Sequence, residues 1–232
     1  MQREGRGKAR NASGPNSTRL LVLIGIGAVV FAGLLVTLSA LAGGGGGGED
    51  SEVLGDIPQN GTTLGDADAP VTIRLYEDFQ CPACGQFARD TLPDVIEQYV
   101  EPGDARLVSE TMTFLGPDSV SAARAALAAG EQDRYWQYAL LLFENQGAEN
   151  SGYVTDDFLT EQAEQVEGLD VDQWQRDRQQ SFEEELRAVE RSAGEAGVNS
   201  TPSLLVSGPN GETLLRGAVP IEEVEGAVEE VG

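Results

Sequence analysis

Residues 71–84 read VTIRLYEDFQCPAC, a stretch that predicts a strand followed at once by two closely spaced cysteines. Its first six residues are β-branched, aromatic and alternating, as is typical of a strand. Apolar residues recur at helical spacing over Gly85–Val100, and residues 105–114 (ARLVSETMTF) read as a second strand. Because a helix is the usual crossover between parallel strands, these segments predict a βαβ unit with the cysteine pair at its strand-to-helix turn.

The remainder of the folded part predicts a helical section and then a return to strands. Helical patterns cover Val120–Ala129, Arg134–Glu144, Thr155–Val166 and Val171–Ala193. Ser203–Val206 predicts a strand, Pro209–Gly211 a hairpin turn and Glu212–Arg216 its antiparallel partner. Pro220 opens a final helix through Val231. The expected fold class is therefore α/β, with a βαβ unit, a helical subdomain and a ββα unit.

Composition limits the chemistry of this chain. Its 232 residues carry a formal net charge of −24 and include two cysteines and no histidine. Such an acidic surface excludes ordinary nucleic-acid binding, which requires cations, and it suggests adaptation to high salt. Without histidine the chain lacks the commonest metal ligand and general base, so we expect no metal site.

The N-terminal part reads as a membrane anchor and a tether. Residues 1–19 are basic, and residues 20–42 form an uncharged apolar run long enough to span a bilayer as a helix. The positive-inside rule then puts residues 1–19 in the cytoplasm and the rest of the chain outside. The alternative is a secretory signal cleaved after Ala42. Residues 43–61, which begin with six glycines, predict a flexible linker.

The candidate active site is Cys81-Pro82-Ala83-Cys84. A cysteine at a helix N-terminus lies beside unpaired N–H groups and the positive end of the helix dipole, which stabilise the thiolate that attacks disulfides. The second cysteine, one turn further on, can close or resolve a mixed disulfide. The alternatives are a structural disulfide, whose small loop would add little stability, and half of a zinc site, which would lack its other ligands.

Residues 199–203 (NSTPS) precede the later apolar strand and supply a second candidate feature. Proline entering a strand is unusual, and a cis Thr201–Pro202 bond would explain it. A cis-proline loop facing the cysteines would expose backbone groups to an extended substrate segment. The alternative is an ordinary loop.

The helical section also contains aromatic residues and a run of glutamates. Core packing is the favoured interpretation of the aromatic residues, with a peptide groove as the alternative: Tyr135, Trp136, Tyr138 and Trp174. The run Glu183–Glu185 is interpreted as a solvated helix face.

Three segments together resemble the DsbA-like disulfide oxidoreductases: APVTI at 69–73, EDFQCPAC at 77–84 and STP at 200–202. The resemblance covers about residues 62–232 and implies a thioredoxin-like fold with a helical insertion at roughly 117–196. It implies that Cys81 is the nucleophile and Cys84 the resolving cysteine. Substrate is then expected to contact Pro82, Ala83, Thr201 and Pro202.

The chain departs from the family pattern at two positions. Many members have an acid six residues before the first cysteine, where this chain has Leu75, and the best-studied members have histidine at the position of Ala83. Both changes remove groups that tune the thiolate or relay protons. Glu77 or Asp78 could act as the proton relay instead; the favoured interpretation is that both are solvated charges at a strand end.

The sequence therefore predicts an extracytoplasmic thiol–disulfide oxidoreductase that introduces disulfides into exported proteins. The redox-active cysteine pair needs no bound cofactor. The resemblance implies that a membrane quinone-linked thiol oxidase reoxidises it. The alternatives are a disulfide reductase or isomerase that uses the same cysteines, and a non-catalytic, membrane-tethered binding or chaperone module.

Overall fold

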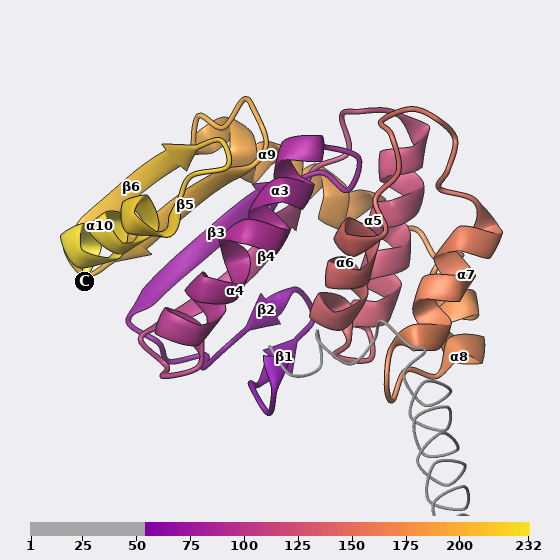
Figure 1. Ribbon diagram of the computed structural model, residues 1–232, viewed down its shortest axis with the longest axis horizontal. Coiled ribbons are helices and arrows are strands. Elements are labelled where there is room, and N and C mark those ends of the chain that lie inside the picture. Colours follow the sequence, from indigo (N-terminus) through magenta and orange to yellow (C-terminus); the bar gives the residue numbers. More distant parts are fainter. Residues whose placement is uncertain (1–53) are drawn as a thin grey trace, which may run out of the picture. The chain divides into compact units, whose positions relative to one another are not determined.

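The computed structural model describes residues 54–232, which are organised around one six-stranded sheet (Figure 1). The strand order is β1-β2-β4-β3-β5-β6. The strands are β1 (Gln59–Asn60), β2 (Thr63–Leu64), β3 (Val71–Glu77), β4 (Ala105–Thr111), β5 (Ser203–Gly208) and β6 (Gly211–Arg216). β3 pairs in parallel with β4 and antiparallel with β5, and β5 pairs antiparallel with β6. The predicted βαβ unit and β-hairpin are therefore confirmed.

The predicted cytoplasmic segment 1–19, the membrane helix 20–42 and most of the linker 43–61 lie outside the described residues. Within residues 54–232, no helix is long and apolar enough to cross a membrane. The end of the expected linker belongs to the folded unit, because Leu54 is buried in the core and Gln59–Asn60 form strand β1.

Helices cover both faces of the sheet. One face carries α3 (Pro82–Asp90), α4 (Leu92–Val95), the π-helical turn η1 (Ile96–Val100) and α10 (Ile221–Val231). The opposite face carries α9 (Glu183–Glu195), where Tyr76 packs with Ala193 and Val198. Residues of β3 alternate between the two faces, as the two-residue period of a strand requires.

The helix predicted over residues 85–100 is interrupted. α3 ends at Asp90, and α4 begins anew at Leu92 with Pro93 in its first turn. Proline has no N–H group, so within α3 it would leave one helical hydrogen bond unmade. In the first turn of a new helix that N–H group is not needed, and Pro93 is therefore tolerated there. The Thr91 hydroxyl at the junction donates to the Val219 carbonyl at 3.0 Å.

The helical insertion consists of α5 (Pro117–Gly130), α6 (Tyr135–Glu144), α7 (Asp156–Gln165), α8 (Val171–Asp177) and α9. The helix expected over residues 171–193 is split into α8 and α9, because α8 packs within the insertion whereas α9 returns to the sheet. The aromatic residues expected in the core are buried: Tyr135, Trp136, Tyr138 and Trp174. The run Glu183–Glu185 is exposed, as predicted.

The Tyr76 hydroxyl, which lies 2.7 Å from the Ser192 hydroxyl, fastens α9 to the sheet. We expect Tyr76→Phe to lower the free energy of unfolding by about 1 kcal/mol, the usual net value of one such hydrogen bond. Urea denaturation of the wild type and the variant measures this difference in the free energy of unfolding. Ser192→Ala is the matched control, and the double variant should lose less than the sum of the two single losses. Additive losses would show that the two hydroxyls do not interact.

Candidate active site

The cysteines lie where the central strand β3 passes into helix α3. Cys81 is the N-cap residue of α3, and Pro82 occupies the first helical turn. The Cys81 amide donates to the Asp78 carbonyl at 2.9 Å, which closes the turn after the strand. The Cys81 carbonyl in turn accepts the amides of Cys84 and Gly85, at 3.0 and 3.1 Å. The sequence placed the cysteine pair correctly at a strand-to-helix turn.

The two sulfurs differ in access. Both are free thiols in the structure, with Cys81 8% exposed and Cys84 1% exposed. Pro82 is exposed and Ala83 half-buried beside them. Cys81 is therefore the more accessible of the two sulfurs.

The segment before β5 lies against Cys81, as predicted. The Thr201–Pro202 peptide bond is cis, which confirms the expectation from the sequence. Because β5 runs antiparallel to β3 with Tyr76 opposite Ser203, the start of β5 lies at the end of β3. The Cys81 thiol donates to the Thr201 carbonyl at 3.4 Å, while Pro202 is buried.

The environment separates the acidities of the two thiols. A hydrogen bond from the Cys84 thiol, aided by the Thr201 hydroxyl and the N–H groups of Cys84 and Ala83, lowers the pKa of Cys81 to about 6 in spite of burial. Burial, together with the neighbouring Cys81, raises the pKa of Cys84 far above its usual range. Near neutral pH the reduced site therefore holds a thiolate at Cys81 and a thiol at Cys84.

The expectation that Glu77 and Asp78 are solvated charges is wrong, because they are 2% and 0% exposed. The Ser109 hydroxyl donates to Glu77 Oε1 at 2.7 Å and lies 2.6 Å from the Tyr135 hydroxyl. Burial is the main cause that raises the pKa of Glu77 to about 8, and the neighbouring acidic groups Asp78 and Cys81 raise it further. Glu77 is therefore neutral at pH 7.

Asp78 has more hydrogen-bond donors than Glu77. Its carboxylate accepts from the Gln80 amide at 2.9 Å, the Ser119 hydroxyl at 2.7 Å and the Leu115 amide at 3.3 Å. Burial still raises the pKa of Asp78, and these donors oppose the rise. The carboxylate thus joins the turn before Cys81 to the start of the helical insertion.

Sequence reasoning missed two further features of this region. Phe114, next to the Leu115 amide that bonds Asp78, is 55% exposed and is the one large apolar side chain so exposed among residues 54–232. Gln146, in the loop after α6, donates to the Phe79 and Cys81 carbonyls at 2.8 and 3.0 Å. Nothing in the local sequence marks Gln146, because its partners lie more than 60 residues away in the chain.

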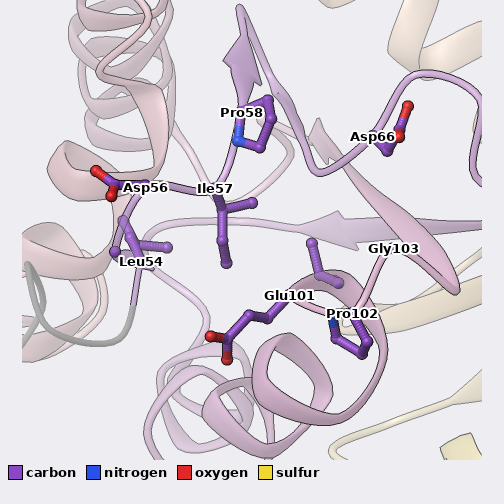
Figure 2. A pocket seen from close by; sticks show the side chains of 10 residues that line it. Leu54, Asp56, Ile57, Pro58, Asp66, Glu101, Pro102 and Gly103 are labelled. Atoms are coloured by element: carbon purple, nitrogen blue, oxygen red, sulfur yellow. The ribbon is translucent and has the colours of Figure 1, made fainter.

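A cavity of about 400 Å³ lies at the other end of the strands (Figure 2). It is lined in part by Leu54, Ile57 and Pro102. Its acidic residues Asp56, Asp66 and Glu101 lie on different sides of it. Glu101 precedes β4, whereas the cysteines follow β3, so about 20 Å of strand separates the cavity from them. Within the part of the chain that the structure describes, no cluster of acidic or cysteine side chains could hold a metal ion.

The dithiol at the start of α3, the facing cis-proline and the central parallel strand pair define a thioredoxin-fold dithiol protein. Residues 58–230 match the family model described as Thioredoxin. A relative from Bacillus cereus, named "Probable disulfide bond formation protein D", is 30% identical over 150 residues, which are 63% of this chain and 69% of the relative. Disulfide bond formation protein D of Bacillus subtilis is 32% identical over 98 residues, which are 41% of this chain and 44% of the relative.

Solved structures agree in fold. BdbD from Bacillus subtilis superposes with a TM-score of 0.65 at 21% identity, over 75% of this chain and 97% of that protein. DsbA from Chlamydia trachomatis superposes with a TM-score of 0.65 at 23% identity, over 73% of this chain and 90% of that protein. The chain belongs to the thioredoxin family and is a DsbA-like thiol:disulfide oxidoreductase.

The raised pKa of Glu77 has a consequence for stability. An acid whose pKa is raised on folding favours the folded state below its unfolded pKa, and this contribution is lost as the pH rises through the folded pKa. Between pH 4.5 and about 8 the wild type should therefore lose stability relative to Glu77→Gln, by about 5 kcal/mol at full ionisation.

Urea denaturation of the oxidised proteins across this pH range measures the difference, since the disulfide form has no thiolate to add its own titration. Exposed Glu184→Gln is the matched control and should follow the wild type. Parallel curves for wild type and Glu77→Gln would show that Glu77 is ionised at neutral pH.

Proposed function

We propose that this protein introduces disulfides into exported proteins, with Cys81 as nucleophile and Cys84 as resolving cysteine. The observation that carries the proposal is the lowered pKa of Cys81, to about 6, at the less buried of the two cysteines. A stabilised thiolate favours the reduced form of the enzyme. The oxidised form is then driven to accept electrons from other thiols, which makes the protein a disulfide donor.

The proposed reaction has two exchanges. A substrate thiolate attacks Cys81 of the Cys81–Cys84 disulfide, forming a mixed disulfide and releasing Cys84 as a thiolate. A second substrate thiolate then attacks the substrate sulfur of that bond and releases Cys81 as a thiolate. The substrate gains one disulfide, and both of its electrons remain in the reduced cysteine pair.

Cys84 must gain a proton in the first exchange, because its pKa lies far above neutral pH. Glu77 is proposed as the donor. It is neutral at pH 7, buried, and close enough to the cysteine pair for the charge of Cys81 to raise its pKa. Asp78 is proposed to hold the turn, because three hydrogen-bond donors favour its ionised form. This proposal separates the two acids that the sequence could not distinguish.

The substrate is proposed to lie as an extended segment across Pro82, Ala83, Thr201 and Pro202. The half-buried Thr201 next to Cys81 could receive its backbone, and the exposed ring of Phe114 could receive an apolar side chain. An unfolded polypeptide offers both an extended backbone and apolar side chains.

The cellular setting is also proposed. Residues 20–42 would anchor the protein, with residues 1–19 in the cytoplasm and the redox domain outside; cleavage after Ala42 would give a secreted form. A membrane quinone-linked thiol oxidase would reoxidise the reduced cysteine pair. No bound cofactor or nucleic acid takes part in the proposed cycle.

One observation favours the second candidate, a reductase or isomerase that uses the same residues. That observation is the Cys81 thiolate of the reduced site, which is a nucleophile beside a buried Cys84 thiol. The same thiolate, starting from the reduced pair, would attack substrate disulfides.

The reduction potential of the full-length protein in glutathione buffers separates these candidates. A potential above about −200 mV is expected for a disulfide donor, and a potential near −270 mV would indicate a reductant. A pair that stays oxidised far below about −300 mV would contradict any catalytic role.

Single-cysteine variants test the two roles. Cys84→Ser is expected to accumulate mixed disulfides with exported proteins, because the resolving thiol is gone. Cys81→Ser should form none, since the buried Cys84 cannot be reached. Non-reducing electrophoresis shows both outcomes. Equal trapping by the two variants would contradict the assignment, and unchanged oxidation of substrate by Cys81→Ser would favour a binding module.

Glu77→Gln tests the proton donor. We expect the wild-type rate of mixed-disulfide formation, measured by stopped-flow with a peptide thiol, to fall relative to the variant as the pH rises through about 8, where Glu77 loses its proton. Below that pH the variant should be slower by about tenfold to a hundredfold, within the usual range of general acid catalysis. Equal rates at all pH values would remove Glu77 from the mechanism.

A further inference from the structure

The loop after α6 reaches back to the turn that carries Cys81. Gln146 donates its two amide hydrogens to the Phe79 and Cys81 carbonyls, at 2.8 and 3.0 Å. The Tyr153 hydroxyl donates to the Phe79 carbonyl at 3.3 Å, and the Asn150 amide donates to Gln80 Oε1 at 2.9 Å. The helical insertion is thus bonded to each of the residues 79–81 immediately before helix α3.

The Cys81 carbonyl is the important one of these acceptors. It also accepts the Cys84 and Gly85 amides and so closes the first turn of α3. The N–H groups of Ala83 and Cys84 in that turn stabilise the Cys81 thiolate. A side chain that fixes the carbonyl therefore fixes the direction of the N–H groups that face the sulfur.

Gly85 makes room for this contact. A Cβ at residue 85 would clash with Gln146 Oε1 and lie 3.0 Å from an Arg89 nitrogen. Both neighbours are the ends of flexible side chains, whereas the backbone of α3 at Gly85 is ordinary helix. A glycine within a helix is destabilising relative to alanine, so this glycine requires a reason, and the approach of Gln146 supplies one.

We propose that Gln146 is a positioning residue for the redox site. Through the Cys81 carbonyl it holds the first turn of α3 in the orientation that stabilises the Cys81 thiolate, and Gly85 is the position that admits it. The helical insertion thereby sets the acidity and the oxidising power of the cysteine pair. This inference rests on the proposed role of Cys81 as nucleophile.

Gln146→Met tests the proposal, because it keeps the length of the side chain and removes both donors. The thiolate of the reduced full-length protein is titrated by its absorbance at 240 nm. Cys81 is the only thiol expected to titrate near neutral pH, since the chain has two cysteines and the pKa of Cys84 is far higher. The midpoint is expected to rise by about 0.5 to 1 pH unit, the usual value of a hydrogen bond. The equilibrium with glutathione should shift about threefold to tenfold toward the oxidised protein.

Gly85→Ala separates a positioning role of the contact from a purely structural one. The new methyl group should push the Gln146 amide aside and raise the Cys81 midpoint, while alanine in the helix should preserve or increase the free energy of unfolding. A purely structural role of the contact would not raise the midpoint without loss of stability. The double variant Gly85→Ala/Gln146→Met should shift the midpoint no further than the larger single shift, because both substitutions remove the same contact.

Gln165→Ala, on the exposed surface of α7, is the matched control and should leave the midpoint unchanged. A wild-type midpoint near pH 6, with Gln146→Met and Gly85→Ala both unchanged, would overturn the positioning role alone. A wild-type midpoint near the ordinary thiol value of 9.0 would instead overturn the proposed function, and this inference with it.

Discussion

The redox site depends on one electrostatic condition, which is that a negative sulfur must be stable at the start of α3 in a protein of net charge −24. The many surface carboxylates oppose this, but water and salt screen them. The groups that favour the thiolate are the Cys84 thiol, the Thr201 hydroxyl and the first N–H groups of α3, all of which hydrogen-bond the sulfur itself. Hydrogen bonds made to the sulfur itself outweigh distant, screened charges, so an acidic surface and a stabilised thiolate coexist.

Sheet topology brings these groups together. β4 is parallel to β3 with Thr111 opposite Glu77, so Ser109 and the start of the insertion reach the same end of the sheet as the cysteines. β5 is antiparallel to β3, so its first residues follow the Thr201–Pro202 loop at that end as well. The insertion leaves from β4, which explains how a loop more than 60 residues after Cys81 can bond its carbonyl.

The features that the sequence predicted correctly are those that local patterns determine. Strand alternation located β3, the cysteine spacing located the start of α3, and a proline before an apolar strand located the cis bond. The burial of Glu77 and Asp78 could not be predicted, because it depends on hydroxyl donors 32 and 41 residues away, at Ser109 and Ser119. The break between α8 and α9 likewise depends on tertiary packing, because α8 packs on other helices of the insertion and α9 packs on the sheet. Helical periodicity in the sequence does not show where a helix packs.

The displacement of the acid from position 75 to position 77 has a simple geometric meaning. Residues two apart on a strand face the same side, so Glu77 points to the same side of the sheet as Leu75 but lies about 6.6 Å nearer to α3. The one arginine of β3, Arg74, points to the other side and pairs with Glu110 at 2.6 Å, so it cannot neutralise Glu77. A buried carboxyl that has only a hydroxyl donor and no cation stays protonated near pH 7. Such a group can give a proton to a leaving thiolate but has little capacity to take one. This supports the proposed direction, in which a substrate thiolate attacks the oxidised pair and Cys84 leaves.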